Sequence, residues 1–125
     1  MDKEEALNVF GDTLAPCSHD PLTGFFRDGC CNTHEMDAGS HTVCIEVSQQ
    51  FLEYSRFIGN DLSTPVPKFG FPGLKAGDRW CLCAARWKQA HEQDMAPKVH
   101  LTRTHKKALE IIPLTILRDY AADLN

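Results

Sequence analysis

The sequence predicts an α+β fold in which three or four helices pack on one small antiparallel sheet in two layers, with two long ordered loops. Two observations lead to this prediction. Segments with period-two alternation and segments with helical spacing both occur, but not in the regular strand–helix–strand order of a parallel sheet. Between them lie long stretches rich in glycine and proline, which interrupt regular structure.

The best strand candidate covers residues 41–47. Val43, Ile45 and Val47 alternate there with more polar residues, and β-branched side chains favour a pleated strand. Because successive side chains of a strand point to opposite faces, Cys44 is expected on the face opposite the valines.

A short amphipathic helix is predicted over residues 49–58. Ser48 is a suitable N-cap, and Gly59 suits the C-terminal end. Phe51, Leu52 and Ile58 fall at helical spacing, so one face of this helix should be buried.

A second helix is predicted over residues 79–90, with Asp78 as its N-cap. Its apolar stripe would comprise Trp80, Cys83, Ala84, Trp87 and His91. A strand over residues 80–83 is the shorter alternative, and it would change the directions in which the Cys81 and Cys83 side chains point.

The C-terminal part predicts one more strand and two more helices. Residues 97–102 fit a strand through Val99 and Leu101, and Thr104 could cap a short helix that ends before Pro113. The last helix would bury a face made of Ile116, Leu117, Tyr120 and Ala121.

Two long loops are expected at residues 11–40 and 60–77. Turn-forming residues recur in both, and the second also carries Phe69, Phe71 and Leu74. Exposed loops rarely contain so many apolar side chains, so we expect this loop to pack on the domain. Long irregular segments in a compact domain are often functional.

The bulk composition is that of one globular domain. The chain has 125 residues, of which 42% are hydrophobic and 24% charged, so it can bury a core without metal or disulfides. Residues 1–7 are expected to be a flexible tail. The net charge of −4 argues against nucleic acid as a partner. The acidic start and the lack of a long apolar run argue against a signal peptide or membrane segment, so we expect a cytoplasmic protein.

A cytoplasmic location bears on the six cysteines. The cytosol keeps thiols reduced, so no disulfide framework is expected. Cys30 and Cys31 are adjacent, and Cys81 and Cys83 are separated by one residue, so a bridge within either pair would be strained. Reduced thiols, a metal site or a redox site remain as alternatives.

Five stretches of the sequence form a specific set of motifs: DPLTGFFRDGCC at 20–31, HTVC at 41–44, GNDLSTP at 59–65, FPGLK at 71–75 and GDRWCLCA at 77–84. Together they resemble a known, largely bacterial family called domain of unknown function 2237. The resemblance extends from about Asn8 to Tyr120 and implies a small two-layer α+β domain. It implies no activity, cofactor or catalytic residue. The family usually has Gly-Pro-Glu at positions 34–36, where this chain has His-Glu-Met.

A zinc site is the first chemical hypothesis. Thiolates bind zinc tetrahedrally, and the candidate ligands are Cys30, Cys31, Cys44, Cys81 and Cys83. Their spacing differs from the usual paired pattern of zinc sites. In a helix Cys81 and Cys83 would point apart, whereas on a strand they would share a face. The competing interpretation is that the cysteines pack in the core as small apolar side chains.

Thiol chemistry is the second hypothesis. Cys81 would lie in the first turn of a helix beside Arg79, where a thiol pKa is lowered, and Cys30 lies in a loop that could expose it. A nucleophile needs a base, for which His41 is the candidate together with His19. Such histidines are more often structural.

An anion-binding pocket is the third hypothesis, with Arg27, Asp61, Arg79 and Arg86 as candidate residues. The competing interpretation is that the arginines pair with aspartates and fix the loops. Any site should form where Arg27, Cys30, Cys31, His41, Asp61, Arg79 and Cys81 converge.

These hypotheses combine into one leading expectation, a binding module with a cysteine-rich site for a metal ion or a small anionic ligand. A thiol-dependent enzyme using Cys30 or Cys81 is the first alternative. A protein-interaction module with structural cysteines, contacting its partner through the 69–74 segment, is the second.

Overall fold

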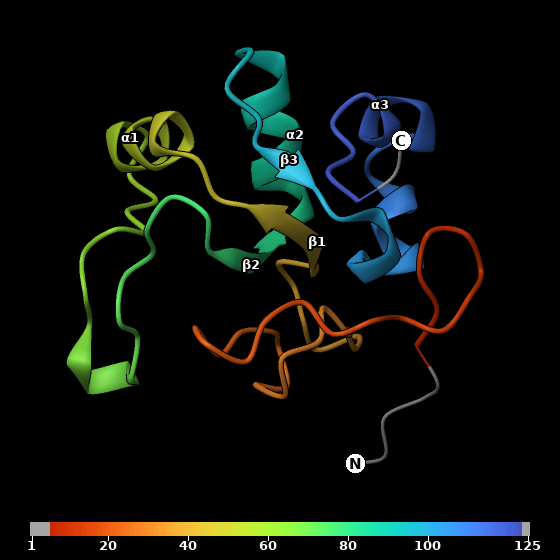
Figure 1. Ribbon diagram of the computed structural model, residues 1–125, viewed down its shortest axis with the longest axis horizontal. Helices are drawn as coiled ribbons and strands as arrows, with labels where there is room; N and C mark the ends of the chain where they lie inside the picture. The colour runs from red at the N-terminus through yellow and green to blue at the C-terminus, as the bar shows by residue number, and fades with distance from the viewer. Residues whose placement is uncertain (1–5, 124–125) are drawn as a thin grey trace.

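The computed structural model describes residues 6–123 and confirms an α+β fold with a small antiparallel sheet (Figure 1). Three α-helices and three short 3-10 helices accompany the sheet in this part of the chain. In chain order, the elements are β1 (His41–Glu46), α1 (Gln49–Phe57), η1 (Pro67–Phe69), β2 (Arg79–Cys83), α2 (Ala84–Glu92), β3 (Lys98–Val99), η2 (Leu101–Arg103), η3 (Lys106–Glu110) and α3 (Leu114–Arg118).

Strand β1 is the centre of the sheet, whose order is β2-β1-β3. It pairs antiparallel with both neighbours, and Cys44 lies opposite Cys81 in the β1–β2 ladder. The register shifts between His41 and Val43, which marks a bulge at the start of β1. This start of the strand borders the candidate site described below.

Helix α1 matches its prediction closely. The Ser48 hydroxyl accepts a hydrogen bond from the Phe51 backbone N–H at 3.1 Å, as an N-cap should. Phe51 and Leu52 are buried, and Gly59 just beyond the helix has a φ of 89°. A positive φ is unfavourable for side-chain-bearing residues, which explains why glycine ends this helix.

The helix predicted over residues 79–90 is wrong in its first half, because this segment forms β2 and the helix begins only at Ala84. Asp78 does not cap it. Instead, its carboxylate accepts a hydrogen bond from the Lys75 N–H at 2.9 Å within a turn. Pairing with β1 outweighs the local helical pattern, since tertiary contacts readily override propensity. The predicted stripe survives in part, because Ala84 and Trp87 are buried on α2.

The C-terminal strand is shorter than predicted. Residues 97–102 yield only the two residues of β3, because the backbone N–H groups of Leu101 and Thr102 donate to the Asp123 carboxylate at 2.8 and 2.9 Å. Those donors are therefore not available to extend a ladder. The predicted helix after Thr104 is the 3-10 helix η3, and His105 caps it in place of Thr104.

A different cluster of buried side chains packs on each face of the sheet. The main apolar cluster contains Val43 and Ile45 of β1, Trp80 and Leu82 of β2, and Trp87 of α2. A second buried cluster consists of Cys17, Cys31, Cys44 and Cys81. The prediction that Cys44 faces away from the valines is therefore confirmed.

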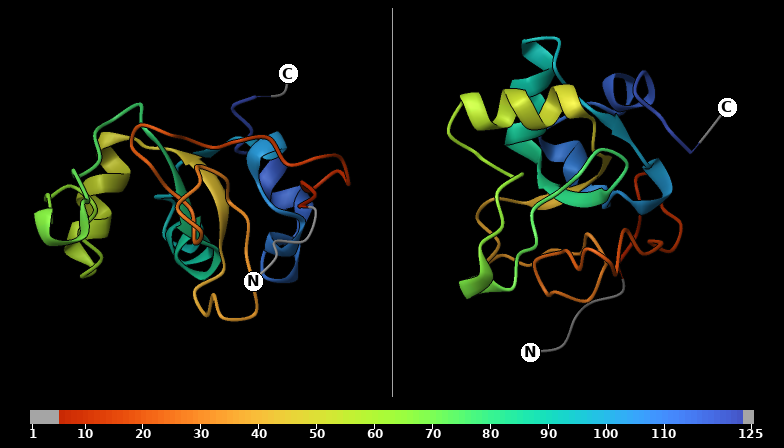
Figure 2. Two further views of the ribbon diagram at one scale, coloured as in Figure 1. Left: turned by 90° about the horizontal axis from the view of Figure 1, so that it is seen from below. Right: turned by 60° about the vertical axis from the view of Figure 1, so that its left-hand side comes forward.

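The loop at residues 11–40 covers the cysteine face. It has no helix or strand beyond isolated bridges, and in Figures 1 and 2 it lies across the sheet from α2. The loop between α1 and β2 extends outward and carries η1, in which Phe69 is 75% exposed. The prediction that the 60–77 loop packs holds for Leu74, which is buried, but not for Phe69.

No helix in the described part of the chain is both long enough and apolar enough to span a membrane. The tail predicted at residues 1–7 lies mainly outside the described residues, and Leu7 forms an isolated bridge with Thr13.

Candidate functional site

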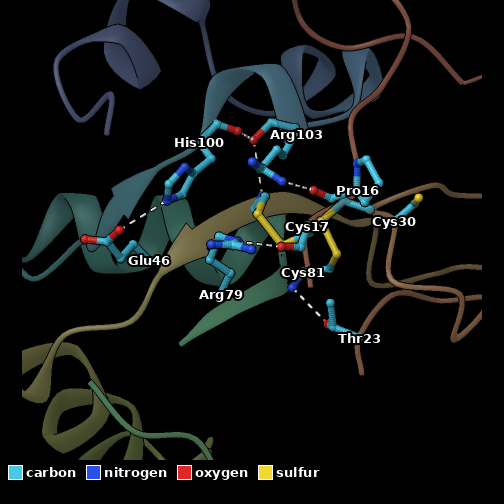
Figure 3. Close-up of a disulfide and its surroundings, with 12 residues drawn as sticks. Pro16, Cys17, Thr23, Cys30, Glu46, Arg79, Cys81, His100 and Arg103 are labelled. Carbon is cyan, nitrogen blue, oxygen red and sulfur yellow. Dashed lines mark hydrogen bonds and ion pairs between the residues drawn. A yellow bond between two sulfur atoms is a disulfide. The ribbon is translucent and has the colours of Figure 1, made fainter. Parts of the chain in front are cut away.

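Four cysteines from two strands and the covering loop meet on one face of the sheet. Cys44 of β1 and Cys81 of β2 are opposite each other, while Cys17 and Cys31 come from the covering loop. Each of the four residues is at most 2% exposed. Disulfides join Cys17 to Cys44 and Cys31 to Cys81, with Cα–Cα distances of 5.8 and 5.2 Å (Figure 3).

The four sulfur atoms form a single cluster rather than two distant bridges. The sulfurs of Cys17, Cys31 and Cys81 all lie within 4.8 Å of one another, and that of Cys44 is bonded to Cys17. Cysteine sulfurs are preferred zinc ligands. The arrangement could therefore hold a metal ion if the two bonds were reduced.

The expectation that these thiols are reduced is wrong for the four clustered cysteines. The bonded residues are separated by 27 and 50 positions, so neither pair was visible as a spacing motif. Cys17 is also missing from the candidate ligands drawn from the sequence, because an isolated cysteine in a loop gives no local signal.

Two other candidate ligands lie outside this cluster. Cys30 and Cys83 are half-buried and take part in neither disulfide. In Figure 3 the sulfur of Cys30 points away from both bonds, although Cys30 is adjacent to Cys31 in sequence. Cys83 is the last residue of β2 and the N-cap position of α2.

Two buried threonines fix the backbone beneath the cluster. The Thr104 hydroxyl accepts from the Cys44 N–H at 3.1 Å, and the Thr23 hydroxyl accepts from the Cys81 N–H at 3.0 Å. Because these two N–H groups donate outward and not to each other, the Cys44–Cys81 pair is of the non-hydrogen-bonded kind. Side chains are closest in such pairs.

Two arginines bind the covering loop at Cys17 (Figure 3). The Arg79 Nε donates to the Cys17 carbonyl at 2.6 Å, and an Arg103 guanidinium nitrogen donates to the Pro16 carbonyl. The Arg103 Nε is buried and lacks a hydrogen-bond partner among the described residues. The two guanidinium groups therefore place positive charge beside Cys17.

A pocket opens beside the cluster, with a volume of about 270 Å³. Its lining includes three residues that the sequence marked as candidates: Arg27, His41 and Cys81. The remaining walls are Thr23, Gly24, Phe25, Leu62 and Trp80. The structure thus brings part of the predicted constellation together around one cavity.

His41, which lines this pocket, is paired with a buried aspartate. The His41 Nδ1 lies 2.7 Å from a carboxylate oxygen of Asp37, whose side chain is only 1% exposed. Burial alone would raise the pKa of Asp37, but hydrogen bonds from the His41 ring, the His41 N–H and the Thr33 hydroxyl lower it. Sequence reasoning missed Asp37. Its position four residues before His41 was the only available signal.

Arg27, another lining residue, holds an unusual conformation. Its φ is 55°, in the left-handed region, and its guanidinium lies 5.7 Å from the centroid of the Trp80 ring. Non-glycine residues in that region cluster at functional sites.

Asp61 and Arg86 do not line the pocket. The Asp61 carboxylate accepts hydrogen bonds from the backbone and hydroxyl groups of Ser63 and Thr64, which lowers its pKa to about 2. Arg86 contacts Gln89 on α2 at 3.3 Å. Both side chains therefore interact within their own segments.

The comparisons with known proteins agree with the resemblance found in the sequence. A search of curated proteins found no match. A family model described as an uncharacterised protein conserved in bacteria matches residues 7–121, nearly the whole chain. The chain therefore belongs to the family of domain of unknown function 2237.

Proposed function

We propose that this protein is a zinc-binding module in which Cys17, Cys31, Cys44 and Cys81 hold one zinc ion when they are reduced. The observation that carries the proposal is the convergence of four buried sulfur atoms, from β1, β2 and the covering loop, in one cluster. Four thiolates are a complete ligand set for structural zinc.

The cluster of four sulfur atoms has suitable dimensions for a zinc ion. With Zn–S bonds of about 2.3 Å, the sulfurs of a tetrahedral site are roughly 3.8 Å apart. Three of the sulfurs already lie within 4.8 Å of one another. Reduction breaks both S–S bonds, and the paired sulfurs can then separate to the spacing that the tetrahedron requires.

Charge also supports a thiolate centre. Zinc with four thiolates carries a net charge of −2, which is costly to bury without nearby cations or hydrogen-bond donors. The guanidinium groups of Arg79 and Arg103 lie beside Cys17, bound to the carbonyl oxygens of Cys17 and Pro16. They supply the compensating positive charge.

The disulfide-bonded arrangement is then the oxidised form of the same centre. Two molecules of hydrogen peroxide would take four electrons from the four thiolates. With four protons, the products are two disulfides, one released zinc ion and four molecules of water. The proposal assigns the protein to a reducing compartment such as the cytoplasm, where glutathione and thioredoxin keep thiols reduced.

Cobalt substitution tests this function. We expect reduced protein to bind Co²⁺ with the intense visible absorption of a tetrahedral thiolate site, saturating at one ion per chain and reversed by zinc. Cys44→Ser should weaken or abolish the signal, whereas Cys83→Ser, which removes a thiol outside the cluster, should leave it unchanged. Weak absorption typical of octahedral cobalt, or equal loss in both variants, would contradict the proposal.

Thiol-dependent catalysis by Cys81 is a second candidate function, favoured by the presence of Cys81 and His41 in one pocket. It predicts that in the reduced protein iodoacetamide alkylates Cys81 much faster than Cys83, and that His41→Asn slows the reaction. The zinc proposal predicts instead that bound zinc protects Cys81. The two functions are therefore separated by alkylation with and without the metal.

A further inference from the structure

We propose that the pocket beside the cluster binds a small organic acid, with Arg27 and His41 contacting its anionic group and Trp80 its apolar part. This site is separate from the proposed zinc centre, although Cys81 borders both. The argument rests on the size of the pocket, its fixed polar groups and its apolar walls.

The volume of the pocket sets the size of the ligand. At about 270 Å³ it lies just below the range of sites for drug-sized molecules, so a compound of metabolite size is expected. The pocket is formed by the N-terminal loop, the start of β1, the loop after α1 and β2, so a ligand there would touch four segments.

Arg27 is placed to receive an anion. Its guanidinium is planar and can donate two parallel hydrogen bonds to a carboxylate or phosphate. The turn that presents it is fixed by a hydrogen bond from the Arg27 N–H to the Gly24 carbonyl at 3.0 Å. Gly24 has a φ of 101°, and a Cβ there would overlap the Cys30 carbonyl, so only glycine suits this wall.

His41 supplies the second polar group in a fixed orientation. The ionised Asp37 carboxylate accepts the Nδ1–H, which leaves Nε2 as the ring nitrogen available to a ligand. Nε2 donates to an anionic group when both ring nitrogens carry a proton. The ring rests against Gly39, where a Cβ would lie 2.7 Å from Cε1. The His41 side chain is itself 45% exposed, so it combines a fixed orientation with access to a ligand.

The other walls favour an organic ligand over a bare inorganic anion. Phe25, Leu62 and the Trp80 ring line the pocket, and Phe25 remains 37% exposed. Sites with mostly apolar walls and a few converging polar groups are the usual form of small-molecule pockets. A carboxylate with a short apolar or aromatic body matches both features.

Benzoate is a suitable probe, monitored by the amide and indole NMR signals of the full-length protein. We expect saturable shifts at Gly24, His41 and the Trp80 indole, with binding at least tenfold weaker for benzamide, the nearly isosteric neutral compound. Arg27→Gln should weaken benzoate binding to a similar extent. Arg86→Gln is the matched control, because Arg86 does not line the pocket, and it should bind as the parent protein does.

The measurement should be made on both the disulfide form and the zinc-loaded form, so that its outcome is independent of the metal proposal. In the Arg27→Gln variant, unchanged NMR signals from residues outside the pocket verify that the protein is folded. The inference is overturned if benzoate causes no saturable shift at these residues, if benzamide binds equally well, or if inorganic phosphate binds as tightly as benzoate.

Discussion

Cys44 and Cys81 face each other across β1 and β2, yet each is bonded to a cysteine of the N-terminal loop rather than to the other. Both backbone N–H groups donate outward to threonine hydroxyls, which brings the two side chains close together. This pair is the base of the cluster, and the loop delivers the remaining two sulfurs. Strand pairing thus preorganises half of the proposed zinc site.

Removing one bridge should release the covering loop without unfolding the sheet. The double variant Cys17→Ala/Cys44→Ala deletes the bridge that spans 27 positions and leaves no lone partner thiol. From chain entropy we expect a loss of roughly 3–4 kcal/mol in the free energy of unfolding of the oxidised protein.

Hydrogen exchange should locate that loss. Amide protection should fall mainly within residues 11–40, since the main apolar cluster around Trp87 is separate from the cysteines. Cys83→Ser is the control and should change stability little. A uniform loss of protection over α1 and α2 would show that the cysteines are part of the main core.

Thr104→Val should destabilise the protein although it preserves the shape of the side chain. Thr104 is fully buried, accepts from the Cys44 N–H and donates to the His100 carbonyl at 2.9 Å. Valine would leave the Cys44 N–H without its acceptor, at a cost of about 1–3 kcal/mol in urea unfolding. The His100 carbonyl would lose one hydrogen bond but would still accept from the Arg103 N–H at 3.1 Å. The exposed Thr115→Val should change stability by less than about 0.5 kcal/mol. Equal effects of both variants would argue against this role of the hydroxyl.

His105 should make the protein less stable as the pH falls below neutrality. Burial and the nearby Lys107 lower the pKa of His105 from its ordinary value of 6.5, so the unfolded chain binds the proton more readily. The stability contribution is therefore complete above pH 6.5 and is lost as the pH falls toward the folded-state pKa. Protonation would also remove the Nδ1 acceptor for the Lys107 N–H.

His105→Asn tests this titration while retaining a side chain that can cap η3. Its urea midpoint should vary less than that of the parent protein between about pH 7 and 5, the range that begins just above the ordinary histidine pKa and extends below it. An unchanged pH dependence would mean that another group is responsible.

Asp37 should control stability in a more acidic range. Its pKa is lowered from 3.8, so its contribution is present above that pH and is lost as the pH falls through the folded-state value. Asp37→Asn should cost about 1–3 kcal/mol at pH 7 and flatten the acid limb of a urea-midpoint profile. The exposed Asp119→Asn should do neither, and a similar profile for both variants would contradict the importance of the His41–Asp37 pair.

Local signals were sufficient for some elements of the fold. Ser48, Phe51 and Gly59 identified α1, because caps and helical spacing act within a few residues. The alternation around Cys44 likewise placed β1 and the faces of its side chains.

Features that depend on distant contacts were not visible in the sequence. Residues 79–83 carry a helical pattern but pair with β1, and this partner could not be inferred from their own composition. The role of Cys17 depends on a loop that crosses the sheet to reach Cys44. Asp37 became recognisable only once the structure showed its buried carboxylate against His41.

Zinc content together with a thiol count tests the central claim most directly. Untagged protein purified under reducing conditions without chelator should contain one zinc ion per chain, with four thiols that become reactive only after a chelator removes the metal. In that result, Cys30 and Cys83 account for the thiols that react beforehand. The account would be contradicted if the purified protein contained no zinc and its clustered thiols, in the presence of added zinc, still reacted freely or returned to disulfides.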